Sequence, residues 1–320
     1  MIAHNKPYKR TQCVALALLC SAAALSQTAV DPLAEARSKL DAGMIQEPEA
    51  ILRKYMAANP SSPDAHFLLG YALFRDQMPK ESLEELTAGA KFRHPRADEL
   101  KIVAGDYVML GDYSDADKWF TQVVSETPND ADAWYLLGRT KYNENEYGAA
   151  ISSFEHALTL LPKFVEAENN IGLSWKELNE HDKARDAFQA AIQWQGDAPL
   201  DAQPFLNLGT LLVDDHKDTD ALPYLKKAVA LSSKNPSTHE ELGKAFLDLN
   251  SLADAQSEVE KAIALAPEVS ALHYKLAQIL RKEGLIDRSQ KEFALCEKLN
   301  GAHSSAKTPN PPPQNISEPK

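Results

Sequence analysis

Two asparagines stand out among the side chains of this 320-residue chain, because they recur in matching contexts. Asn170 lies in the sequence ENNIG and Asn207 in FLNLG, two residues before a glycine in each case. A side-chain amide offers both a donor and an acceptor, so it can pair with the backbone of an extended peptide whatever the sequence of that peptide. These residues therefore predict hydrogen bonding to a bound polypeptide.

Patterns typical of enzymes and metal sites are absent from the sequence. It contains no His-Glu-x-x-His, no glycine-rich phosphate loop and no Cys-x-x-Cys. His239 lacks the second histidine at helical spacing that a zinc site requires, and it shares a repeat position with His66, His273 and Trp134, which predicts a packing role. Cys296 is expected to be a buried small residue rather than a reactive thiol. We therefore expect no catalytic residue, no metal site and no cofactor.

The elements that position the asparagines follow from a period of 34 residues. A small residue marks the same point in each unit, and further series of small and large apolar residues follow 12, 16 and 19 residues after it. This many coincident spacings indicate stacked repeats. These small residues, which we use as register marks, follow one another at steps of 34 residues with a single step of 37. They are Gly70, Ala104, Gly138, Gly172, Gly209, Gly243 and Ala277.

Each unit contains two stretches with apolar residues at helical spacing, separated by a short polar turn. The small residues allow the two helices to approach closely, and the large residue between them fills the gap. Replacing Ala150 or Ala184 with leucine is expected to overpack this crossing, at a cost of about 1–3 kcal/mol. The sequence therefore predicts an all-α fold, an α-solenoid of stacked antiparallel helix hairpins.

The chain resembles the tetratricopeptide repeat proteins. Their pattern W-x2-L-G-x2-Y…A-x3-F…P is matched at Trp134, Leu137, Gly138, Ala150, Phe154 and Pro162. The resemblance implies a right-handed superhelix of about seven to eight 34-residue repeats. In this family the asparagine at the position of Asn170 often contacts a peptide, and the resemblance implies that role here. Tyr135 and Arg139 replace two residues of the carboxylate clamp found in chaperone-binding members, so that specificity is not expected.

The repeats divide the chain into units. A degenerate unit is expected at 27–62, with a second helix from Glu49 to Asn59 and Pro48 where the small residue belongs. Three extra residues near Gln195 predict either a longer turn between hairpins or a change of superhelical twist. Residues 301–320, rich in Pro, Ser and Asn, are expected to be disordered. The seven regular units are 63–96, 97–130, 131–164, 165–201, 202–235, 236–269 and 270–300.

Residues 1–26 have the layout of a secretory signal peptide. A basic start with Lys6, Lys9 and Arg10 precedes an uncharged run of 13 residues that ends at Leu25. This run is shorter than the roughly 20 residues that a membrane-spanning helix needs. We expect cleavage and export to the periplasm or the outside of the cell, with an uncleaved anchor as the alternative.

The chain is acidic, with a formal net charge of −12. An acidic surface repels nucleic acid phosphates and anionic lipid headgroups, and it favours neutral or basic partners. We expect a protein or an extended peptide as partner, with no nucleic acid and no stable membrane span.

Stacked hairpins line a concave groove with the first helix of each unit. The leading hypothesis is an exported, non-catalytic scaffold that binds a peptide or partner protein in this groove, within an envelope or secretion assembly. The alternative is a structural homo-oligomer that stacks through its terminal repeats. The candidate peptide-binding residues in the central units are Tyr135, Arg139, Asn170, Lys176, Asn207 and Lys244.

Overall fold

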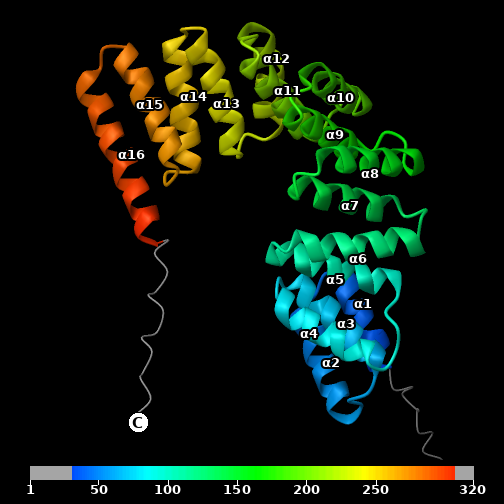
Figure 1. Ribbon diagram of the computed structural model, residues 1–320. Coiled ribbons are helices and arrows are strands. Elements are labelled where there is room, and N and C mark those ends of the chain that lie inside the picture. Colours follow the sequence, from blue (N-terminus) through cyan, green and yellow to red (C-terminus); the bar gives the residue numbers. More distant parts are fainter. Residues whose placement is uncertain (1–30, 307–320) are drawn as a thin grey trace, which may run out of the picture.

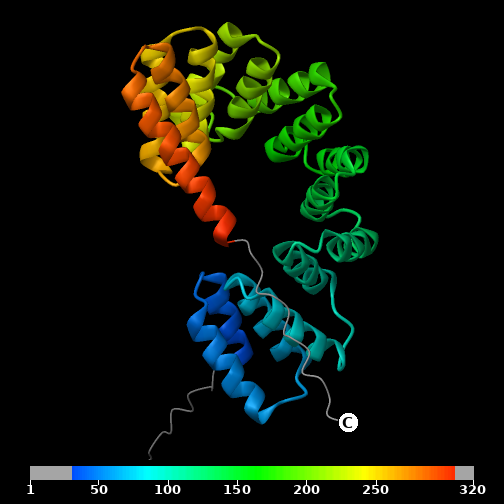
Figure 2. The same ribbon diagram turned by 60° about the vertical axis from the view of Figure 1, so that its left-hand side comes forward.

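The computed structural model describes residues 31–306, and these residues form sixteen α-helices and no strand. Successive helices pair into hairpins that stack into one open arch, as Figure 1 and Figure 2 show from two sides. This arrangement confirms the predicted all-α solenoid. The helices are α1 (Pro32–Asp41), α2 (Gln46–Ala58), α3 (Pro63–Arg75), α4 (Pro79–Ala90), α5 (Ala97–Leu110), α6 (Tyr113–Glu126), α7 (Ala131–Asn143), α8 (Tyr147–Leu160), α9 (Val165–Glu177), α10 (His181–Trp194), α11 (Gln203–Asp214), α12 (Asp218–Leu231), α13 (Pro236–Asp248), α14 (Leu252–Leu265), α15 (Ser270–Lys282) and α16 (Ile286–Ala306).

The turn inside each hairpin contains one residue with left-handed backbone geometry. Such a residue ends the first helix and reverses the chain, and glycine or asparagine adopts this geometry at low cost. These residues recur with the repeat, again with a single step of 37: Gly43, Gln77, Gly111, Asn145, Asn179, His216, Asn250 and Gly284.

The centre of a hairpin is the place where the small residue of the first helix meets the large residue of the second. A Cβ atom placed on Gly138 would lie 2.6 Å from Cδ1 of Phe154, and one on Gly172 would lie 2.5 Å from Cε1 of Phe188. Both phenylalanines are fully buried. The two glycines therefore allow their hairpins to close directly onto the rings.

Three histidines at one repeat position connect both helices of a hairpin to the preceding loop. In each case Nδ1 lies 2.6–2.7 Å from a glutamate on the second helix, and Nε2 lies 2.9–3.1 Å from a loop carbonyl. Trp134 holds the same position in another hairpin, and its Nε1 donates to the carbonyl of Pro128. The position is therefore structural. The pairs are His66 with Glu85, His239 with Glu258 and His273 with Glu292.

The two ends of the array differ from the regular units. In the degenerate first unit, α1 and α2 still form a hairpin, and Pro48 lies in the first turn of α2, where the N–H groups have no partner within the helix. At the other end α16 continues to Ala306, so residues 301–306 are helical rather than disordered. Proline first interrupts the sequence after them at Pro309. The predicted signal peptide and residues 307–320 lie outside the described residues.

The three extra residues lengthen a turn. Eight residues join α10 to α11, whereas four join α8 to α9. The side chain of Gln195 organises this loop, because its Oε1 accepts from the backbone N–H groups of Leu200 and Asp201 at 3.2 and 2.9 Å. Its Nε2 donates to the carbonyl of Asp201 at 3.2 Å. The loop presents Leu200 to solvent with 92% of its surface exposed.

Candidate functional site

The first helices of the hairpins form the concave side of the arch. These odd-numbered helices contact one another from hairpin to hairpin, whereas the even-numbered helices contact mainly the helices adjacent to them in sequence. Among the neighbouring odd-numbered helices, α5 and α7 approach each other least closely. The concave side is therefore a continuous surface with one looser junction.

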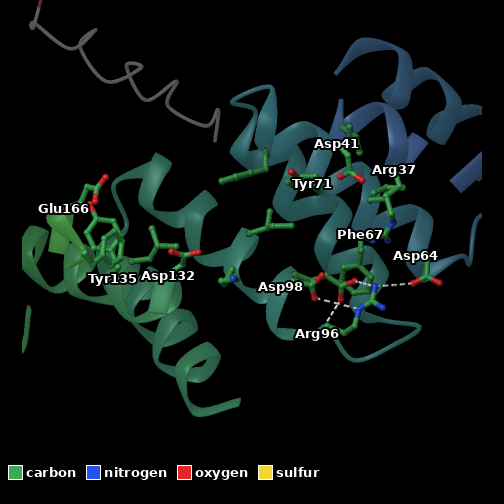
Figure 3. Close-up of a pocket in the computed structure, with 18 residues that line it drawn as sticks. Arg37, Asp41, Asp64, Phe67, Tyr71, Arg96, Asp98, Asp132, Tyr135 and Glu166 are labelled. Carbon is green, nitrogen blue, oxygen red and sulfur yellow. Dashed lines mark hydrogen bonds and ion pairs between the residues drawn. The ribbon is translucent and has the colours of Figure 1, made fainter. Parts of the chain in front are cut away.

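A groove of about 690 Å³ runs along this surface from α1 to the start of α9 (Figure 3). Its volume lies in the range of cavities that hold ligands. Aromatic side chains supply large, rigid contact area for a ligand. The apolar residues of its walls are Leu40, Phe67, Leu68, Tyr71, Phe74, Ile102, Tyr135, Leu136 and Phe164.

A recess of about 230 Å³ adjoins the groove at the loose junction between α5 and α7. It shares Phe74, Lys101 and Leu136 with the groove. Gly105 lies at its wall, at the repeat position where α3 carries Tyr71 and α7 carries Arg139. A Cβ atom at Gly105 would lie 2.7 Å from Cε2 of Phe74, so the missing side chain allows the Phe74 ring of α3 to pack directly against α5.

The groove also continues past Phe164. Phe164 and Glu166 line a second hollow of about 460 Å³, which is bounded on its far side by Leu200 of the long loop. Together the two hollows extend the concave surface from α1 to the turn before α11.

One end of the groove is fixed by an ion pair whose acidic member is buried. Glu99 is only 4% exposed, and both its oxygens accept hydrogen bonds from the Arg93 guanidinium, at 2.7 and 2.9 Å. It also accepts from the backbone N–H of Arg96 at 2.7 Å, so it caps the first turn of α5. Burial raises the pKa of Glu99, but the hydrogen bonds from Arg93 and Arg96 outweigh burial and lower this pKa overall.

Three of the predicted site residues lie together. Tyr135 lines the groove, and the Arg139 guanidinium lies 5.9 Å from the centre of its ring. The Asn170 amide donates to the Tyr135 hydroxyl at 3.4 Å and to the carbonyl of Glu166 at 2.7 Å. The amide hydrogens of Asn170 are therefore already directed at partners within the chain.

The other three predicted site residues lie outside this groove. Lys176 and Lys244 each donate to the carboxylate of Asp214 at 2.9 Å. Asn207 donates to Asn169 and accepts from Gln203, both at 2.9 Å. These polar side chains of the central hairpins thus form hydrogen bonds and ion pairs with one another.

Several groove residues were missed by sequence reasoning, although the repeat register contains a signal for them. Acidic residues lie six positions before the register mark in four successive units, and all four line the groove in Figure 3. They are Asp64, Asp98, Asp132 and Glu166. Gly105 directly follows the register mark Ala104, so its separate role is visible only in three dimensions.

Within the part of the chain that the structure describes, no cluster of three or more His, Cys, Asp or Glu side chains could hold a metal ion. None of the helices described is long and apolar enough to cross a membrane.

The architecture defines the class: an α-solenoid of helical hairpins, the fold of protein-interaction scaffolds. A family profile described as tetratricopeptide repeat matches residues 33–97 and 240–294, and a second profile of the same description matches residues 131–164. The chain is a tetratricopeptide repeat protein, which confirms the resemblance seen in the sequence.

Solved structures of this class agree on the fold. A tetratricopeptide repeat protein from Parabacteroides merdae superposes with a TM-score of 0.62 at 20% identity, over 78% of this chain and 97% of that one. PilW, a type IV pilus biogenesis factor, superposes with a TM-score of 0.58 at 20% identity, over 66% of this chain and 95% of that one.

Among curated proteins, the human Protein O-mannosyl-transferase TMTC3 is 26% identical over 190 residues, which are 58% of this chain and 21% of that protein. Protein FlbA of Caulobacter vibrioides is 22% identical over 204 residues, 63% of this chain and 34% of that protein. The chain thus spans about a fifth to a third of the length of these relatives.

Proposed function

We propose that this chain is a non-catalytic scaffold that binds an extended polypeptide segment along the groove between α1 and α9. The observation that carries the proposal is the groove itself, which is continuous across the first helices of successive hairpins and has five aromatic side chains in its walls. Side chains of a bound segment would gain contact with these walls, and water would be excluded from the apolar surface on both sides.

The proposed site lies nearer the N-terminus than the sequence predicts. In the central hairpins Asp214 pairs with both Lys176 and Lys244, and Asn169 accepts a hydrogen bond from the side-chain amide of Asn207. A ligand there would have to displace these bonds before it formed new ones. In the groove, Tyr71 and Tyr135 present half-buried rings. Apolar side chains of a ligand can pack against these rings without displacing hydrogen bonds or ion pairs of the protein.

We also propose that the chain is exported and acts in an envelope or secretion assembly. The support is the sequence pattern of residues 1–26, a basic start followed by an uncharged run. N-terminal sequencing of the protein recovered from cells would show cleavage after Ser26, and an intact N-terminus would contradict the proposal.

The groove is tested by panning a random peptide library against the full chain. The affinity of the enriched peptides is then measured by fluorescence anisotropy. Tyr71→Ala, in the groove wall on α3, is expected to weaken binding about tenfold. Tyr113→Ala removes a half-buried tyrosine from the outer helix α6 and serves as the matched control. Equal affinities for the two variants would show that the peptides bind elsewhere.

Self-association is a second candidate, favoured by one observation. The last hairpin exposes large apolar side chains: Tyr274 and Ile286 are each 49% exposed and Leu295 is 37% exposed. Light scattering over a range of concentrations decides this point, since a monomer at high concentration excludes a stacked oligomer.

A further inference from the structure

The lining of the groove is more negative than positive. Six carboxylates and three cations line it. Four of the carboxylates are the acidic series Asp64, Asp98, Asp132 and Glu166, which brings one negative charge per hairpin into the groove. In Figure 3 this series extends along the groove from the α3 end to the α9 end.

The cations in and beside the groove compensate mainly one end of this series. Arg93 and Arg96 bind Glu99 and also approach Asp64, and Arg96 lies 3.8 Å from Asp98. Lys101 is paired with Asp130 at 2.7 Å, so its charge is already balanced outside the groove lining. The α3–α5 end is therefore nearly neutral.

The other end keeps a net negative charge. Asp132 and Glu166 are exposed and take part in none of the ion pairs of the described residues, and the Arg139 guanidinium also lies at this end, 5.9 Å from the centre of the Tyr135 ring. They lie on either side of Tyr135, whose ring is half-buried in the groove wall. Negative charge that remains uncompensated beside an apolar wall attracts a ligand that carries both cationic and apolar groups.

The recess at Gly105 gives the groove a place for an apolar side chain. Its walls include Phe74, Val108 and Leu136, and its volume of about 230 Å³ opens onto the groove through residues that the two share. The recess lies between the neutral end and the acidic end, next to α7, which carries Asp132.

We infer that the groove binds an extended basic segment of a partner protein. An aliphatic or aromatic side chain occupies the Gly105 recess, and lysine or arginine side chains on the flanking positions pair with Asp132 and Glu166. An extended strand advances about 3.3 Å per residue with alternate side chains on opposite sides, so apolar and basic positions separated by a few residues reach these two features. This inference rests on the proposed function and specifies the chemistry of its ligand.

A second copy of this chain fits the groove poorly. Its net charge is −12, so an approaching copy would place further negative charge against the uncompensated carboxylates. The same carboxylates repel the phosphates of nucleic acids and of anionic lipids. A basic polypeptide is the occupant that satisfies both the charge and the apolar recess.

The experiment uses the full chain and three fluorescein-labelled synthetic peptides. The peptides share a central leucine and are identical except at four flanking positions, which carry lysine, glutamine or glutamate. Anisotropy titrations are performed at about 50 mM and about 300 mM salt. We expect the lysine peptide to bind roughly fivefold or more tightly than the glutamine peptide at low salt, the glutamate peptide to bind most weakly, and the differences to shrink at high salt.

Two variants assign the charge effect to the groove. Asp132→Asn combined with Glu166→Gln is expected to reduce the affinity for the lysine peptide to that for the glutamine peptide, and to leave the latter unchanged. Glu81→Gln combined with Glu84→Gln makes the same change in net charge on exposed residues of the outer helix α4, and is expected to keep most of the preference. Equal loss in both double variants would overturn the inference, because it would show a general charge effect.

The recess has its own test. Val108→Phe enlarges a half-buried side chain of the recess wall, so it narrows the recess. This variant is expected to weaken the binding of the lysine and glutamine peptides about equally. A lysine peptide with alanine in place of the central leucine is expected to lose little affinity. Circular dichroism and thermal melting establish that this variant is folded, and the exposed Asp132 and Glu166 variants carry the test if it is not.

The outcomes separate the two levels of proposal. If the lysine and glutamine peptides bind wild type equally and both lose affinity in Tyr71→Ala, the groove binds peptide but the inference about a basic ligand falls. If none of the peptides binds and panning yields none that depends on Tyr71, the proposed function falls, and the inference falls with it.

Discussion

The Ser82 hydroxyl lies 2.6 Å from Oδ2 of Asp106 and 2.9 Å from the carbonyl oxygen of Gly70. A hydroxyl has one proton and cannot donate to both acceptors. In the last hairpin Ser289 donates to the carbonyl of Ala277, which identifies the serine-to-carbonyl bond as the repeating feature. Asp106 is fully buried, and burial raises its pKa to about 7. In its protonated form the Asp106 carboxyl can donate to the Ser82 hydroxyl, which then keeps its own proton for the carbonyl of Gly70.

This contact predicts that stability falls as the pH rises. The pKa of Asp106 is higher in the folded chain than in the unfolded chain, where it is close to 4, so the folded state binds the extra proton between these values. The stabilising contribution is complete below about pH 4 and is lost as the pH rises through about 7. Asp106→Asn keeps a donor toward Ser82 and is expected to stabilise the protein at pH 8, on the order of 1–4 kcal/mol, with a smaller effect at pH 5.

Urea denaturation at the two pH values measures this difference. Asp197→Asn, on the exposed part of the long loop, removes a carboxylate that has no buried partner and serves as the control. A gain from Asp106→Asn that is the same at pH 5 and pH 8 would contradict a protonated Asp106.

The pair of the half-buried Arg93 and the buried Glu99 predicts a large cost of removing one partner. Arg93→Met leaves a carboxylate that is 4% exposed without its main donor, and the expected loss is about 3–5 kcal/mol at pH 7. Replacing both residues with apolar ones is expected to recover much of this loss. The pKa of Glu99 in the folded chain lies below its ordinary value of 4.5. The stabilising contribution of Glu99 is therefore present above about pH 4.5, and it is lost as the pH falls through the lower pKa of the folded state.

Thermal or urea unfolding measures the cost, with Arg288→Met as comparison. Arg288 pairs with Glu260 between two exposed side chains, so its loss is expected to cost less than about 1 kcal/mol. Similar costs at the two arginines would argue against a special role for burial at Glu99.

Adjacent alanines on α8 test the packing of the hairpin crossing. Ala150 is fully buried, and Ala149 is exposed on the same helix. Ala150→Leu is expected to destabilise the chain by about 1–3 kcal/mol, because the added atoms must displace tightly packed neighbours. Ala149→Leu is expected to change stability by less than about 0.5 kcal/mol. Differential scanning calorimetry of the two variants decides, and equal melting temperatures would show that the crossing is loose.

Gln195 is expected to hold the long loop in place. In Gln195→Ala the amide protons of Leu200 and Asp201 lose their acceptor, so they should exchange with deuterium faster, with little change in melting temperature. Gln193→Ala alters an exposed neighbour on α10 and should leave this exchange unchanged. Hydrogen exchange measured by NMR resolves the individual amides, and unchanged protection in Gln195→Ala would show that other contacts order the loop.

The repeat spacing was enough to predict the fold, because each hairpin depends on local contacts. The meeting of Gly138 with Phe154 follows directly from residues 16 positions apart. The site was harder to predict, because it depends on contacts between hairpins. Asn207 reaches Asn169 over 38 residues, and whether its amide is free depends on the curvature of the stack and on the longer turn between them. The recess at Gly105 likewise depends on the distance between α5 and α7.

The groove is assembled from the first helices of successive hairpins rather than from any one of them. The distance between the two ends of the groove, and so its width, consequently depends on how strongly the arch is bent. A ligand that bridges several hairpins resists straightening, and by thermodynamic reciprocity a force that straightens the arch weakens the hold on the ligand.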